Sequence, residues 1–134
     1  MKVIKIPYDK KIPCTVHEIA EASDQPLEQY GRVLKDIKKL IGIDWAEIVV
    51  LRLLKNEDPQ RDYCLIVDEI GKLKDVRHER FNFRASQFYP GTFYGDPIVG
   101  DVVLCARQWT DGYGECDLAG LTDKEEAILM FELS

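Results

Sequence analysis

Hydrophobic residues recur along this chain with a period that changes between segments, and each period predicts a different element. Between residues 27 and 41 they recur every three or four positions, which is typical of an amphipathic helix. This apolar stripe consists of Leu27, Tyr30, Val33, Leu34, Ile37, Leu40 and Ile41. Gly42 follows the stripe directly and is a residue type that often ends helices, so we expect one helix over 27–41.

Short apolar runs predict the strands of a sheet. The segments 3–6 and 14–19 flank a polar loop and indicate an N-terminal hairpin. The run 46–54 is rich in aliphatic and β-branched residues, and a polar turn separates it from the run 63–67. A connection this short favours an antiparallel pair over a crossover. The run from Val99 to Ala106 is the most apolar, so we expect it to form a central strand.

The last predicted element is a helix that runs from Thr122 to Leu133. Thr122 and Glu125 have the T-x-x-E spacing of a capping box, in which each side chain accepts a hydrogen bond from the other residue's backbone. We expect the buried stripe of this helix to consist of Ala127, Ile128, Met130 and Phe131.

Together these elements predict an α+β fold in a single domain that spans residues 1–134. We expect a mostly antiparallel sheet of about five strands, packed by one long helix and a C-terminal helix. A doubly wound parallel sheet is not favoured, because only one internal helix is available for a crossover. A small sheet exposes its edge strands, and with exposed aromatic residues this suggests a homodimer.

The composition is that of an ordinary globular protein, with 46% hydrophobic and 31% charged residues. The formal net charge of −6 argues against general nucleic-acid binding, which needs a surplus of Lys and Arg. The N-terminal residues lack the apolar run of a signal peptide, and no segment approaches the ~20 apolar residues that span a bilayer. We therefore expect a cytoplasmic protein that does not associate with membranes.

The cysteines and histidines do not form a recognisable catalytic or metal-binding motif. Cys14, Cys64, Cys105 and Cys116 lie far apart without a C-x-x-C pair. Buried free thiols in a reducing cytosol are favoured over disulfides or a metal site. His17 and His78 are the only imidazoles, and neither has the sequence context of a catalytic base or a metal ligand. We therefore predict no catalytic residue, no cofactor and no metal.

The candidate binding surface is the loop 74–94, which combines basic and aromatic residues. Guanidinium groups hold phosphate or carboxylate, and aromatic rings stack on planar bases. If the phenylalanines at 81, 83, 88 and 93 point inward, the residues between them face solvent. The predicted ligand-binding residues are Arg77, Arg80, Asn82, Arg84, Tyr89 and Tyr94. The alternative is a solvated loop whose aromatic side chains dock onto the sheet.

Several motifs of the second half occur together and resemble a known family. They are D-E-x-G-K-L over 68–73, N-x-x-A-x-x-x-Y over 82–89 and G-D-x-I-V-G over 95–100, with L-T-D-K-E at 121–125. This combination resembles the DUF3846 family, small proteins of unassigned function that are common in bacteriophages and mobile elements. The segment 77–80, R-H-E-R, is longer and more charged than the family pattern. Any specificity of this member would lie there.

Two hypotheses about function follow. The first is a non-catalytic binding protein, encoded by a phage, that inhibits or sequesters a host component or an anti-phage defence component. It rests on the resemblance, the small size and the lack of a nucleophile with its base. The second is a binder of a nucleotide-like small anionic molecule, or an enzyme acting on one, that uses the Arg/aromatic loop 74–94.

Overall fold

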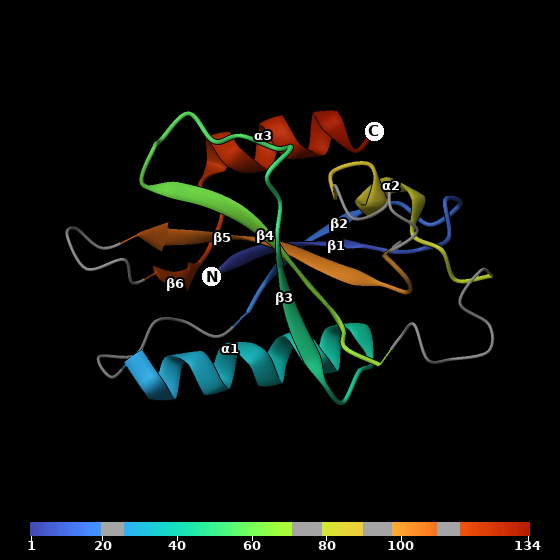
Figure 1. Cartoon of the computed structure of the whole chain (residues 1–134), viewed down its shortest axis with the longest axis horizontal. Helices are drawn as coiled ribbons and strands as arrows, with labels where there is room; N and C mark the ends of the chain where they lie inside the picture. Colours follow the sequence, from blue (N-terminus) through green and yellow to red (C-terminus); the bar gives the residue numbers. More distant parts are fainter. Residues whose placement is uncertain (20–25, 71–78, 90–97, 110–115) are drawn as a thin grey trace.

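In the computed structural model, an antiparallel sheet lies between helices on both of its faces (Figure 1). The structure describes residues 1–19, 26–70, 79–89, 98–109 and 116–134. Within these residues the strands are β1 (Lys2–Ile6), β2 (Thr15–Glu18), β3 (Ala46–Val50), β4 (Arg61–Asp68), β5 (Val102–Trp109) and β6 (Cys116–Ala119). The helices are α1 (Pro26–Ile41), α2 (Phe83–Ser86) and α3 (Asp123–Glu132).

The predicted α+β class is confirmed. The strands follow the order β2-β1-β5-β4-β3, and every pairing is antiparallel. The β1–β2 and β3–β4 hairpins and the central position of β5 agree with the apolar pattern of the sequence. The strand β6, which pairs with the second half of β5, was not predicted. Its four residues are too few to show a reliable alternation.

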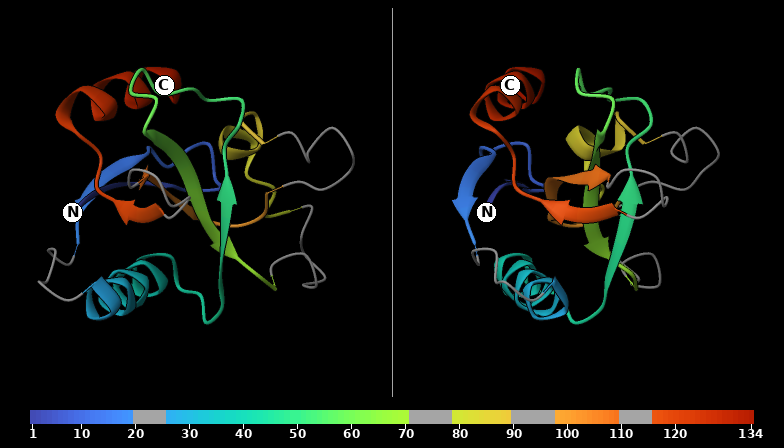
Figure 2. Two further views of the ribbon diagram at one scale, coloured as in Figure 1. Left: turned by 60° about the vertical axis from the view of Figure 1, so that its left-hand side comes forward. Right: turned by 90° about the vertical axis from the view of Figure 1, so that its left-hand side faces the viewer.

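The sheet has an apolar core on each face. In β5, Val102 and Leu104 belong to the core that also contains α3 residues, whereas Val103 and Cys105 belong to the core that contains α1 residues. Figure 2 shows α1 on one side of the sheet and α2 and α3 on the other. Because both faces are covered, the central strands are apolar at consecutive positions, as the sequence of β5 indicated.

The helix α1 covers its face with residues spaced four apart. Val33, Ile37 and Ile41 are buried against the sheet. Gly42 follows with a φ of 68°, a left-handed conformation that glycine adopts without strain and that ends the helix. Within the residues that the structure describes, no helix is long and apolar enough to cross a membrane.

The helix α3 has the predicted capping box but faces the sheet differently from the prediction. Thr122 and Glu125 accept hydrogen bonds from each other's backbone N–H, at 3.1 and 2.9 Å. The buried residues are Glu125 and Leu129, and Leu133 follows at the same spacing. The predicted stripe is wrong: Ala127, Ile128 and Phe131 are exposed, Phe131 by 79%, and Met130 is half-buried.

An ion pair explains this orientation. The Arg61 guanidinium of β4 donates to both carboxylate oxygens of Glu125, at 2.7 and 3.0 Å. Arg61 also donates to the carbonyl of Gly120 at 2.8 Å, and Asn56 donates to Glu125. A buried carboxylate is tolerated only when it is paired, so Glu125 must point toward Arg61. This rotation leaves Ile128 and Phe131 on the outer face.

The same ion pair makes stability depend on pH. Burial opposes ionisation of Glu125, but hydrogen bonds from Arg61, the Thr122 backbone and Asn56 outweigh it and hold the pKa of this carboxyl below its ordinary value. The folded-state pKa is therefore below the unfolded-state pKa. The resulting stability is present above the unfolded-state pKa and is lost as the pH falls through the folded-state pKa.

We predict that the free energy of unfolding of the wild type falls below about pH 4 more steeply than that of Glu125→Gln, which cannot ionise at this position. Denaturant unfolding between about pH 3 and pH 7 measures both slopes. Glu57→Gln is the matched control, because Glu57 forms an exposed ion pair with Lys124 and should leave the slope nearly unchanged. Parallel curves for wild type and Glu125→Gln would contradict the role of this pair.

Candidate functional site

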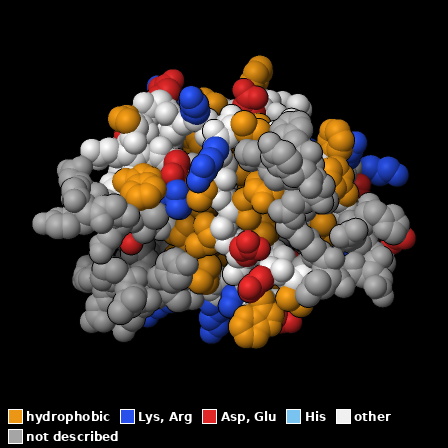
Figure 3. Space-filling view, viewed as in Figure 1, with side chains coloured by type: hydrophobic (Ala, Val, Ile, Leu, Met, Phe, Trp, Pro, Cys, Tyr) orange, Lys and Arg blue, Asp and Glu red, His pale blue; other side chains and the backbone are white. Residues whose placement is uncertain are grey.

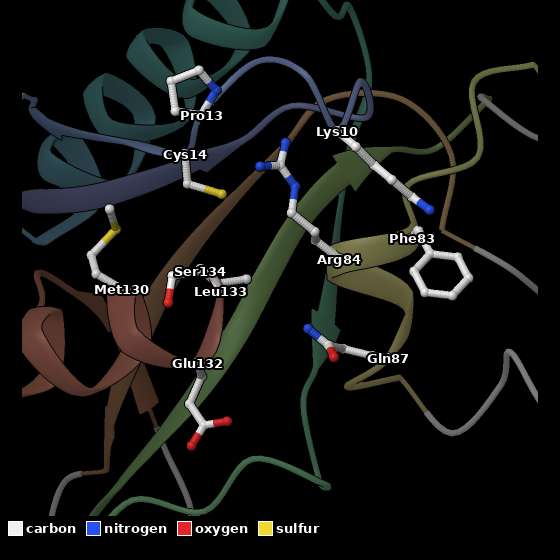
Figure 4. A pocket seen from close by; sticks show the side chains of 10 residues that line it. All are labelled: Lys10, Pro13, Cys14, Phe83, Arg84, Gln87, Met130, Glu132, Leu133 and Ser134. Carbon is white, nitrogen blue, oxygen red and sulfur yellow. The ribbon is translucent and has the colours of Figure 1, made fainter.

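A pocket of about 530 Å³ opens between the β1–β2 loop, α2 and the end of α3 (Figure 4). This volume lies within the ~300–1,000 Å³ of typical small-ligand pockets. Its lining residues are Lys10, Pro13, Cys14, Phe83, Arg84, Gln87, Met130, Glu132, Leu133 and Ser134. We call it the α2–α3 pocket. It combines apolar walls with two cationic side chains and one acidic side chain.

Asn82 positions α2, which forms one wall of the pocket. Its Oδ1 accepts from the Ala85 N–H at 3.0 Å and caps the helix. Its Nδ2 donates to the carbonyls of Ile6 and Gly100, both at 2.9 Å. The side chain therefore ties α2 to the end of β1 and to the residues before β5. Asn82 is fully buried with its polar atoms occupied, so the prediction that it faces a ligand is wrong.

The condition that the phenylalanines at 81, 83, 88 and 93 point inward is not met at Phe83, and Phe93 lies outside the described residues. Phe88 is buried, but Phe83 is 58% exposed and lines the pocket. Phe83 follows the N-cap residue Asn82, whose side chain turns back to accept from the Ala85 N–H. At this end of α2 the ring of Phe83 is therefore exposed, whereas the amide of Asn82 is buried.

Arg84 braces the β1–β2 loop from inside the pocket. Its Nη2 donates to the carbonyls of Pro7, Asp9 and Ile12, at 2.7, 3.1 and 2.8 Å. Its Nε is buried without a hydrogen-bond partner, and no described carboxylate lies within salt-bridge distance of the guanidinium. Arg84 is thus a fixed positive charge that carbonyl dipoles hold in place but do not neutralise.

Cys14 and Lys10 line the pocket beside Arg84. Figure 4 shows the Cys14 sulfur and the Arg84 guanidinium directed toward each other. Burial raises the pKa of the Cys14 thiol, although the charge of Arg84 acts in the opposite direction. Lys10 places its Nζ 4.2 Å from the centre of the Phe83 ring, a cation–π contact. Between Lys10 and Arg84, the pocket offers two donors for a carboxylate or a phosphate.

The other predicted site residues lie elsewhere. Arg80 rests over the ring of Tyr8 at 5.4 Å and does not line the pocket. Tyr89 is half-buried and packs against the core on the α3 side. Arg77 and Tyr94 lie outside the described residues. Of the predicted set, the structure therefore brings Arg84 to the pocket, and the ligand-binding prediction for Arg77, Arg80, Tyr89 and Tyr94 stays a prediction.

Sequence reasoning missed the contributions of the β1–β2 loop and of the end of α3. Lys10 and Cys14 are about 70 residues from Arg84, and Met130 and Leu133 are about 45 residues beyond it. The polar and basic composition of 8–13 is the one sequence signal for the loop's role. Nothing in the sequence indicates that these segments meet, because their contact depends on the sheet order.

The lining of the pocket includes a cysteine, Cys14. Catalysis by Cys14 would need a thiolate, and the raised pKa keeps this group protonated near neutral pH. Among the described lining residues there is no imidazole that could act as its base. The described residues also contain no group of three or more His, Cys, Asp or Glu side chains that could hold a metal ion.

Comparisons with known proteins concern the fold. No model of a protein family matches the chain, a result that neither supports nor contradicts the resemblance to DUF3846. No curated protein matches it either. Among solved structures, the chain is similar to the crystal structure of the small RNA methyltransferase HEN1, with a TM-score of 0.56 and 15% sequence identity. This similarity covers 98% of our chain and 15% of that chain, and it shows the fold alone.

We predict that Arg84→Ala lowers the free energy of unfolding by about 2 kcal/mol, because three carbonyls lose a charged donor. Hydrogen exchange of residues 8–13 should also become faster. Arg80→Ala is the matched control, since it removes a cation–π contact that is worth roughly 0.5–1 kcal/mol. Equal losses of stability for the two variants, with no change in exchange of the loop, would show that Arg84 does not brace it.

Proposed function

We propose that this protein is a non-catalytic binding protein that holds a partner protein at the α2–α3 pocket and at the exposed hydrophobic side chains of the elements that form it. The observation that carries the proposal is the exposed hydrophobic side chains of the three elements that form the pocket. Ile12 of the β1–β2 loop, Phe83 of α2, and Ile128 and Phe131 of α3 are 51%, 58%, 40% and 79% exposed. They are four of the seven large hydrophobic side chains that are exposed among the described residues. Phe83 lines the pocket with Met130 and Leu133, and an apolar pocket beside exposed hydrophobic side chains is typical of an interaction site.

The walls of the pocket indicate the chemistry of the partner. Phe83, Met130 and Leu133 offer an apolar surface for an aliphatic or aromatic side chain. Lys10 and Arg84 are positive groups in a protein whose formal net charge is −6. Glu132 lies at the same pocket and disfavours a strongly acidic ligand. The arrangement therefore fits a short segment that carries one acidic residue beside an apolar one.

The biological setting of the proposal comes from the resemblance to DUF3846. A phage-encoded protein of this kind would act in the host cytoplasm, where it would inhibit or sequester a host component or an anti-phage defence component. The alternative, a nucleotide-like ligand of the Arg/aromatic loop, has less support, because Arg80 stacks on the ring of Tyr8 and does not line the pocket.

A second exposed apolar surface lies at the edge of the sheet. Figure 3, which looks onto β3, shows hydrophobic side chains across the middle of this face. Trp45 directly precedes β3 and Leu53 follows its last residue by three positions; they are 62% and 52% exposed. β3 is also an outer strand in the strand order of the described residues. A homodimer, which stays a prediction, would pair here and leave the α2–α3 pocket open.

Capture from a host lysate with three variants tests the proposed function. We expect Phe83→Ser to weaken binding of a captured protein about tenfold or more, because Phe83 lines the pocket. Phe131→Ser should weaken it as well, because Phe131 is the most exposed large hydrophobic side chain of α3. Leu53→Ser is the matched control, since Leu53 is exposed to a similar degree at β3 and should bind like the wild type.

Two results would contradict the proposal. If Leu53→Ser abolishes binding of the captured protein and Phe83→Ser does not, the interface lies at β3. A nucleotide that co-purifies with the protein, without any stoichiometric protein partner, would favour the alternative. Thermal unfolding of each variant shows whether a loss of binding reflects a loss of fold.

A further inference from the structure

Two cysteine thiols face each other at the centre of the sheet. Cys64 of β4 and Cys105 of β5 are direct partners in the antiparallel register. Their Sγ atoms are 3.5 Å apart, and both residues are completely buried. They lie in the core between the sheet and α1, together with Val33 and Ile37. The two thiols are 41 residues apart in the sequence.

The backbone at this pair is already suited to a disulfide. Directly opposed residues of an antiparallel pair have Cα atoms about 4.5–5.5 Å apart, and disulfides span Cα separations of about 4.4–6.8 Å. The sulfurs need to approach each other by about 1.5 Å to reach bonding distance, which small rotations of the two side chains supply. No movement of one strand past the other is required.

We propose that Cys64 and Cys105 are an oxidative modification site, which hydrogen peroxide converts into a cross-strand disulfide. One thiolate attacks a peroxide oxygen and breaks the O–O bond, which gives a sulfenic acid and, after protonation, one water. The second sulfur then attacks the sulfenic sulfur, the S–S bond forms and the hydroxyl leaves as a second water. The two thiols lose two electrons and two protons, which reduce the peroxide to two waters.

The surroundings of the pair determine when this reaction occurs. The thiols are covered by α1, whose Val33, Ile37 and Ile41 pack in the same core. The hydrogen bond with Cys64 and burial both raise the pKa of Cys105, so little thiolate forms while the core is closed. Oxidation therefore requires α1 to open locally. The pair therefore reacts slowly with peroxide, and the resulting disulfide links the two central strands.

This inference is independent of the proposed function, since the pair lies on the opposite face of the sheet from the α2–α3 pocket. It can be tested on the full chain with Cys14→Ser and Cys116→Ser, which leaves only the pair of interest among the four cysteines. The protein is incubated with hydrogen peroxide under native conditions. Intact mass and peptide mapping then identify the products, and hydrogen exchange verifies that the fold is retained.

We expect the loss of two hydrogens, a peptide that joins Cys64 to Cys105, and reversal by dithiothreitol. The cross-link closes a long loop, so the oxidised protein should melt roughly 5–10 °C higher. Cys64→Ala in the same background should show no cross-link and no rise in melting temperature. If Cys64→Ala does not fold, Cys105→Ala serves the same purpose.

Two outcomes would overturn the proposal. One is that both thiols of the folded protein remain reduced after an incubation with peroxide that is long enough for the amides of α1 to exchange their hydrogens. The other is oxygen addition to either sulfur without any cross-link, which would show that the second thiol cannot reach the first in the native sheet.

Discussion

The ion pair between Arg61 and Glu125 determines how the outer helix of this protein lies on its sheet, and the candidate site depends on that helix. The Arg61 guanidinium donates hydrogen bonds to the carboxylate of Glu125 and to the carbonyl of Gly120. Glu125 also belongs to the capping box that begins α3. One buried carboxylate thus sets where the helix starts and which side faces the core. Met130 and Leu133 reach the pocket, and Phe131 stays outside, as a consequence of that rotation.

Asn82 and Arg84 fix the position of the other side of the pocket, which α2 and the β1–β2 loop form, as Arg61 fixes α3. The side-chain amide of Asn82 forms hydrogen bonds with backbone groups of β1, of α2 and of the residues before β5. Arg84 then reaches from α2 to the carbonyls of the β1–β2 loop. Three segments that are distant in the sequence are therefore joined by polar side chains bonded to backbone groups. Such bonds specify one geometry, so the pocket is formed before any partner arrives.

Elements with a strong local pattern could be predicted from the sequence, and orientations that depend on distant partners could not. The apolar stripe of α1 and the apolar run of β5 each extend over many residues, so the sequence alone indicates which positions are buried. The buried face of α3 was predicted from its apolar residues, but Glu125 overrides them through Arg61, 64 positions earlier. Likewise, the sequence predicted Arg84 as a basic residue of the site. It could not predict that Lys10, Phe83 and Met130 line the same pocket, because their proximity depends on the order of the strands.

The central claim is that the partner binds at the α2–α3 pocket, and hydrogen exchange of the free and the bound protein tests it most directly. Binding should slow exchange in three separate segments: the β1–β2 loop, α2, and the last two turns of α3. The strand β3 should exchange equally in both states. Protection confined to β3 and its flanking residues, with no change in α2 or α3, would contradict the account.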